Sequence, residues 1–144
     1  MRFFENLFIS DKKKAALNLK ASEEFLMENM VRPGIITLKS GLQYQEIKNG
    51  EGEKPYYSQK VTCHYQGTLI NGTVFDSTLK RRTPPTFPLC VLIKGWREGL
   101  QLMSAGSKWR LFIPPHLGYG NQQVSAKIGP NCALIFDVEL LSIN

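Results

Sequence analysis

The sequence has few of the residues that bind metals, form disulfides or act as nucleophiles. Its 144 residues include three cysteines and two histidines, and the cysteines at 63, 90 and 132 make no Cys-x-x-Cys motif. This spacing matches no zinc site and no disulfide framework, so we expect free thiols, no metal and no cofactor. Free thiols are typical of a reducing compartment, and a cytoplasmic location is therefore predicted.

Long apolar runs and concentrated charge are also missing. No run reaches the 18 or more apolar residues of a membrane span, and the short apolar stretch at 1–9, interrupted by Glu5 and Asn6, does not resemble a signal peptide. The net charge is +6, but the cations are scattered, with two short runs at 12–14 and 80–82. A nucleic-acid or membrane-surface protein driven by this charge would bind in a salt-sensitive way. No nucleic-acid motif accompanies the runs, so we expect no nucleic acid partner.

Glycine and proline are absent before Pro33, and this part of the chain is predicted to be a helix over 11–31. Ser10 is a plausible N-cap, and Arg32-Pro33-Gly34 would end the helix. Apolar residues recur along one side of it at spacings of four and seven, at Ala15, Leu19, Leu26 and Met30. The composition changes after this point. We therefore divide the chain into a helical extension at 1–35 and a main domain at 36–144.

The main domain has the patterns of short strands separated by turns. Alternation of apolar and polar residues predicts strands at 42–47, 61–68, 74–76, 107–113 and 133–143, and Asn71-Gly72 predicts a hairpin. Trp96, Leu100 and Met103 would share one face of a short helix that ends at Ala105-Gly106. The economical architecture is α+β, with a curved antiparallel sheet wrapped around one short helix.

One acid and several large apolar or aromatic side chains are spread along the second half of the chain. They are Tyr65, Phe75, Asp76, Ile93, Trp96, Tyr119 and Phe136. Large rings around a single polar group predict a dry pocket for a neutral, apolar substrate.

Four motifs around these residues resemble the FKBP-type peptidyl-prolyl cis-trans isomerases. They are VTCHYQGTLINGTVFDST at 61–78, FPLCVLIKGWREGLQLMSAG at 87–106, LFIPPHLGYG at 111–120 and IGPNCALIFDVELL at 128–141. The resemblance runs from about Gly41 to Asn144 and implies a five- to six-stranded half-barrel sheet around one short helix. The preceding helix and SGLQY at 40–44 resemble the bacterial macrophage infectivity potentiator branch, with a shortened N-terminal arm.

The resemblance also implies an activity and a site. The activity would be rotation about X-Pro bonds in proline-containing polypeptides, in assistance to folding, with rapamycin and tacrolimus as inhibitors. The residues expected to act on the substrate are Asp76, Tyr119, Phe75 and Trp96, with Trp96 as the pocket floor. Those expected to bind it are Tyr65, Leu92, Ile93, Ile128 and Phe136, and Asp76 would accept a hydrogen bond from Tyr65.

Taken singly, each of these residues has an ordinary structural alternative. Trp96 could be a core tryptophan with its N–H satisfied, and Asp76 could cap a turn. The other rings and isoleucines could be core packing. The alternative for the whole chain is an FKBP-like protein-binding module or chaperone with little catalytic activity. Pro85 stands where many eukaryotic members have an aromatic residue, so a pocket more open on that side is expected. The loop 121–127 lacks the glycine and proline common in the family, which leaves the peptide preference open.

Self-association is expected through the N-terminal helix, if it occurs. Large apolar side chains at Phe3, Phe4, Leu7, Phe8 and Ile9 precede the amphipathic helix. A homodimer would cover them, as would folding back onto the domain or contact with a membrane surface.

Overall fold

The computed structural model describes residues 10–144, so the apolar cluster at 3–9 lies outside the described part of the chain. The elements follow one another in the order α2 (Asp11–Asn29), β1 (Ile35–Thr37), β2 (Gln43–Lys48), β3 (Lys60–Leu69), β4 (Val74–Ser77), β5 (Thr86–Pro88), η1 (Leu89–Val91), α3 (Lys94–Leu100), β6 (Lys108–Ile113), η2 (Pro115–Leu117) and β7 (Leu134–Ile143). The η elements are single turns of 3-10 helix.

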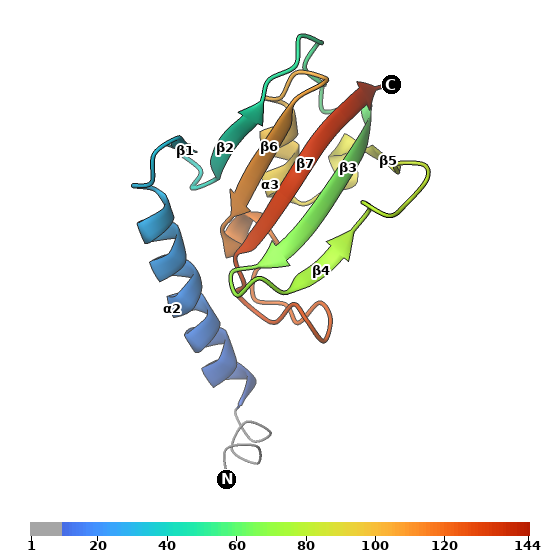
Figure 1. The fold of residues 1–144 in the computed structure, drawn as a ribbon. Helices are drawn as coiled ribbons and strands as arrows, with labels where there is room; N and C mark the ends of the chain where they lie inside the picture. The colour runs from blue at the N-terminus through green and yellow to red at the C-terminus, as the bar shows by residue number, and fades with distance from the viewer. Residues whose placement is uncertain (1–9) are drawn as a thin grey trace.

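One antiparallel sheet curves around α3, with α2 outside it (Figure 1). The strand order is β1-β2-β6-β7-β3-β4, and β5 pairs with β3. The α+β class and the half-barrel around one short helix are confirmed. The sheet has seven strands because the three-residue strands β1 and β5 extend it. Segments this short carry too little alternation to be predicted.

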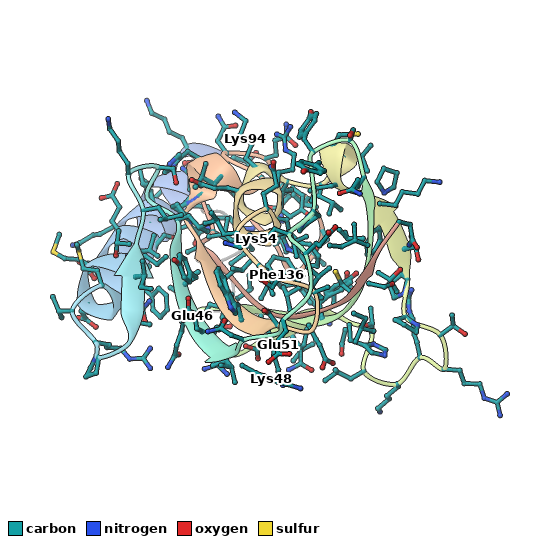
Figure 2. The ribbon with its side chains drawn as sticks, turned by 90° about the horizontal axis from the view of Figure 1, so that it is seen from above. Glu46, Lys48, Glu51, Lys54, Lys94 and Phe136 are labelled. Carbon is teal, nitrogen blue, oxygen red and sulfur yellow. The ribbon has the colours of Figure 1, made fainter. Side chains whose placement is uncertain are left out.

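The core fills the concave side of the sheet. Along β7 the alternate residues Leu134, Phe136, Val138 and Leu140 are all buried, as their period of two predicts. Figure 2 shows Phe136 inside the curve of the sheet. On β3, Val61, Cys63 and Tyr65 point the same way. Burial raises the pKa of the Cys63 thiol to about 12.

The short helix α3 lies directly on β6 because glycine faces the sheet. A Cβ atom on Gly95 would come within 2.7 Å of Ile113, and one on Gly99 within 3.0 Å of Leu111. A side chain at 95 would force Ile113 to move, and one at 99 would press on Leu111, so glycine allows the helix to lie this close. The close packing turns Trp96 into the concave side of the sheet, where it is 4% exposed.

Helix α2 begins as predicted, with the Ser10 side chain accepting a hydrogen bond from Lys13 N. It turns a mixed face towards the domain, on which Ser22 and Asn29 are buried and the partly buried Phe25 lies with its ring centroid 6.2 Å from that of Phe112 of β6. Leu19 and Met30 of the apolar stripe remain 38% and 47% exposed. The Asn29 amide donates to Gln43 Oε1 of β2 at 2.7 Å. None of the helices in residues 10–144 combines the length and apolar character needed to cross a bilayer.

The boundary at residue 35 stays a prediction. In the structure, β1 begins at Ile35 and pairs with β2, so the sheet starts at that residue. The short helix also ends earlier than predicted, at Leu100, and Met103 is buried from the turn that follows it.

Candidate functional site

A cavity of about 410 Å³ gathers every residue that the sequence indicated for the site. The nine predicted residues on its wall are Tyr65, Phe75, Asp76, Leu92, Ile93, Trp96, Tyr119, Ile128 and Phe136. Four further residues, Phe87, Val91, Val124 and Ser125, also line it. The cavity is within the size range of small-molecule sites.

Trp96 forms the base of the cavity, and the rings of Tyr65, Phe87 and Phe136 meet it edge to face. The ring centroids of Tyr65 and Phe136 lie 5.1 Å and 5.3 Å from that of Trp96, at interplanar angles of 89° and 84°. This geometry places ring edges against ring faces and is favourable beyond simple burial. Within residues 10–144 the Trp96 indole N–H has no acceptor, whereas Trp109 donates to Asn49 Oδ1 at 2.9 Å. Trp96 is therefore both a core residue and a surface of the cavity.

The walls stand close together because Gly67 lies behind them. Phe75 and Phe136 meet edge to face at 5.4 Å between centroids. A Cβ atom on Gly67 would come within 2.6 Å of Phe75 and 2.7 Å of Phe136. Gly67 is a positioning residue that the sequence reasoning missed. A glycine inside a strand is a signal of close approach that could have found it.

Asp76 lies at the exposed rim and is tied to the wall. The Tyr65 hydroxyl donates to Asp76 Oδ2 at 2.7 Å, the hydrogen bond that the resemblance implied. The two residues come from neighbouring strands, since Gly67 of β3 is paired with Asp76 of β4. Asp76 therefore places a negative charge at the edge of an otherwise apolar cavity.

Both cavity tyrosines keep their protons to higher pH than usual. Burial raises the pKa of Tyr65, and the hydrogen bond and negative charge of Asp76 raise it further, while Arg81 lowers it. Burial and the charge of Asp76 also raise the pKa of Tyr119. Their hydroxyls are hydrogen-bond donors over the whole neutral and mildly alkaline range.

Two donors face the cavity without a protein acceptor. Within residues 10–144, neither the Tyr119 hydroxyl nor the Ile93 N–H donates a hydrogen bond. Ile93 precedes α3, where a helix leaves backbone N–H groups unsatisfied. A peptide backbone in the cavity would find donors here for its carbonyl groups.

The loop between η2 and β7, residues 118–133, covers one side of the cavity. It contributes Tyr119, Val124, Ser125 and Ile128. Val124 and Ser125 were missed because they stand in a stretch without periodicity, and the fold alone brings them to the site. Phe87 lies on β5, in the FPL motif that carried the resemblance, so the motif could have indicated it.

The described residues offer no site for a metal. In the segment 10–144, no three His, Cys, Asp or Glu side chains are grouped in a way that could hold an ion. The lining of the cavity itself offers apolar walls, one carboxylate and hydrogen-bond donors.

Two segments of the chain match known protein families. Residues 51–141 match the family described as FKBP-type peptidyl-prolyl cis-trans isomerase. Residues 1–45 match the domain described as amino terminal to FKBP-type peptidyl-prolyl isomerase.

Similar proteins are found in bacteria. The chain is 49% identical over 126 residues to the peptidyl-prolyl cis-trans isomerase Mip of Coxiella burnetii, covering 88% of this chain and 55% of that protein. It is 51% identical over 131 residues to the outer membrane protein MIP of Legionella longbeachae, covering 91% of this chain and 56% of the relative. The chain thus spans about half the length of these relatives.

Solved structures show the same fold. The crystal structure of FkpA from Escherichia coli superposes with a TM-score of 0.88 at 40% identity, covering 93% of this chain and 62% of FkpA. A peptidyl-prolyl cis-trans isomerase from Pseudomonas syringae pv. tomato gives a TM-score of 0.84 at 34% identity, covering 90% of this chain and 96% of the other.

The raised pKa of Tyr65 predicts a loss of stability at alkaline pH. Above pH of about 10, tyrosines of the unfolded chain ionise, whereas folded Tyr65 holds its proton, so the folded state binds more protons. The free energy of unfolding must therefore fall as the pH rises, by at most about 1.4 kcal/mol per pH unit for one group. We expect Tyr65→Phe to flatten this fall in denaturant titrations between about pH 9 and 11.

Asp76→Asn serves as the intermediate case for the same titration. It removes the negative charge but leaves Tyr65 buried, so its pH dependence should lie between those of the wild type and Tyr65→Phe. Parallel profiles for all three proteins would contradict the assignment.

Proposed function

Because the chain belongs to the FKBP-type peptidyl-prolyl cis-trans isomerase family, we propose that it accelerates cis–trans exchange of X-Pro bonds in polypeptides and so assists folding. The observation that carries the proposal is Trp96 at the base of an aromatic cavity, with the Tyr65–Asp76 hydrogen bond at its rim. The neighbouring donors Ile93 N–H and Tyr119 hydroxyl suit a peptide backbone.

The chemistry of the X-Pro bond suits such a cavity. Rotation must give up amide resonance, with a barrier of about 18–20 kcal/mol. The planar amide is strongly dipolar and the twisted amide is less so. A cavity that replaces water with aromatic walls therefore disfavours the planar form relative to the twisted one, and no nucleophile or proton transfer is needed.

Each residue has a defined part in this proposal. The proline ring would lie on Trp96 between Tyr65, Phe75 and Phe136. The Tyr119 hydroxyl and the Ile93 N–H would donate to substrate carbonyls, with Leu92 beside Ile93 and Ile128 closing the cavity from the loop. Asp76 would act through its charge and by orienting the Tyr65 hydroxyl. Holding the flanking backbone fixes the bond in a geometry that favours rotation.

A binding module or chaperone with little catalytic activity is the alternative. It would use the same cavity to hold proline-containing segments, so that only a rate measurement separates the two functions. A cytoplasmic location also stays a prediction. It is supported by the three cysteines, all of which are free thiols.

The isomerase activity is tested with proline tetrapeptides in which the residue before proline is varied. We expect acceleration that favours a large apolar residue such as Leu or Phe, because the aromatic cavity buries that side chain as well. Asp76→Ala should lower kcat/KM by about ten- to a hundredfold without unfolding the protein, since a hydrogen bond to a charged group is worth about 1.5–3 kcal/mol.

Ser77→Ala is the matched control for the isomerase assay. Ser77 follows Asp76 on β4 and its side chain points to the other side, towards Gln66. This variant should keep wild-type activity. A folded wild-type sample with no rate above background for any peptide would overturn the proposal, and unaltered activity of Asp76→Ala would mean that Asp76 has no part in the reaction.

Rapamycin and tacrolimus are expected to bind in the cavity and inhibit, because their pipecolinyl ring imitates proline. The reporter is the fluorescence of Trp96, whose ring forms the base of the cavity. Trp109 also emits but lies elsewhere, stacked on Tyr44 at 4.3 Å between centroids.

Two substitutions separate the tryptophan signals. Trp109→Phe should retain both binding and the change in fluorescence, whereas Trp96→Leu should lose the change and weaken binding. The absence of binding and inhibition at micromolar drug would mean that Pro85 and the loop 121–127 have altered the site.

We also propose that α2 pairs with a second copy of the chain. Leu19 and Met30 are partly exposed on the predicted stripe, with Leu26 between them. Light scattering of the full chain should give twice the monomer mass, and Leu19→Glu should dissociate the pair. Leu17→Glu places the same charge about 200° away around the helix and should leave it intact. A monomeric wild type would rule out the dimer.

A further inference from the structure

Helix α2 holds the loop that covers one side of the cavity. This loop, residues 118–133, carries Tyr119, Val124, Ser125 and Ile128 on the cavity wall. No residue of α2 lines the cavity. The helix nevertheless makes five hydrogen bonds with this loop. We propose that α2 sets the position of this loop and that Ser22 is a positioning residue for substrate binding, an inference that rests on the proposed function.

Ser22 makes the central contact. Its hydroxyl donates to Asn131 O at 2.8 Å and accepts from Ala133 N at 2.8 Å. Ser22 is 1% exposed and Ala133 is 2% exposed, so water has little access to the hydrogen bond between these two residues. A buried backbone group that loses its partner is costly. The Ser22 hydroxyl therefore ties down the end of the loop just before β7 begins.

Two residues of α2 that precede Ser22, Asn18 and Ala15, also form hydrogen bonds with the end of the loop. The Asn18 amide donates to Pro130 O at 2.8 Å, and the Asn131 amide donates to Ala15 O at 3.2 Å. Asn131 has φ of 56°, the one positive value outside glycine in residues 10–144. Asparagine tolerates this backbone better than most residues. The bonds to Ala15 and Ser22 hold it there.

The line of contacts reaches the cavity wall through Gln123. Lys14 Nζ donates to Gln123 Oε1 at 3.0 Å, and Gln123 Nε2 donates to Ile128 O at 3.2 Å. Ile128 is 5% exposed and lines the cavity. Two hydrogen bonds thus connect the helix to a residue that would contact the substrate.

The spacing of these side chains shows that one helix face is used. Lys14, Asn18 and Ser22 are four residues apart and therefore lie one above the other along α2. The loop has hydrogen bonds of its own, such as Val124 N to Ile128 O at 3.0 Å, and it closes at its base through Asn131 N to Gly120 O at 2.7 Å. These bonds shape the loop, and the contacts with α2 fix its place over the cavity.

A loop held less firmly should affect binding more than the rotation step. Trp96, Phe75 and Asp76 come from other elements and keep their places when the loop moves. Ile128 and the Tyr119 hydroxyl would meet the substrate less often in the right position. The expected result is a higher KM with a nearly unchanged kcat.

The experiment compares two equally buried residues of α2 in the full chain. Ser22→Ala removes contacts with the loop. Asn29→Ala removes the contact with Gln43 of β2, and Asn29 is 2% exposed. We expect Ser22→Ala to speed hydrogen exchange of the backbone amides at 121–133 by about tenfold and to raise KM about fivefold, with kcat within about twofold. Asn29→Ala should leave both the loop exchange and KM at wild-type values.

Hydrogen exchange is measured without substrate, so it separates this inference from the proposed function. If the wild type has no isomerase activity but Ser22→Ala still loosens the loop, the function fails and the positioning of the loop stands. Wild-type loop exchange in Ser22→Ala, or equal changes in Ser22→Ala and Asn29→Ala, would overturn the inference. If Ser22→Ala does not fold, Asn18→Ala, which is only partly buried, must show the same effects at smaller size.

Discussion

The contact of Trp96 with the rings around it is the interaction on which the rest of the structure depends. Glycine at 95 brings α3 onto β6, and this close packing turns the indole towards β3 and β7. One side of this ring cluster lines the cavity, and the other side packs in the core. Any change that moves α3 must therefore disturb both the cavity and the core.

A cavity of this kind needs few polar groups, but their placement is demanding. Asp76 is exposed at the rim, and its charge is met by the hydroxyl of Tyr65. The donors of Tyr119 and Ile93 come from two separate connections, the loop 118–133 and the turn before α3. Strands hold the rings of Tyr65, Phe75 and Phe136, whereas connections hold the donors of Tyr119 and Ile93. This division explains why contacts outside the cavity, such as those of α2, have a bearing on it.

Much of the fold could be predicted because its signals are local. The period of two along β7, the turn at Asn71-Gly72 and the N-cap at Ser10 are each determined by neighbours in the chain. The strands β1 and β5 could not be predicted, because three residues form a strand only when a longer strand is beside them. Motifs indicated nine of the thirteen residues that line the cavity. Val124 and Ser125 were not indicated, because they belong to a loop whose path is set by contacts with distant residues.

The sequence by itself determined the α+β class, the positions of the main strands along the chain and the set of large rings around one acid. Those features depend on side-chain periodicity and on motifs, which are properties of short segments. Only the tertiary structure decided which face of α2 meets the domain. Its apolar stripe suggested one face, but Leu19 and Met30 of that stripe stay exposed. The helix meets the domain through Phe25, which packs near Phe112, and through hydrogen bonds of Asn18, Ser22 and Asn29, since the loop and β2 present backbone and amide groups there that need partners. Such a choice depends on which unsatisfied groups lie opposite the helix, and these come from residues that are far away in the chain.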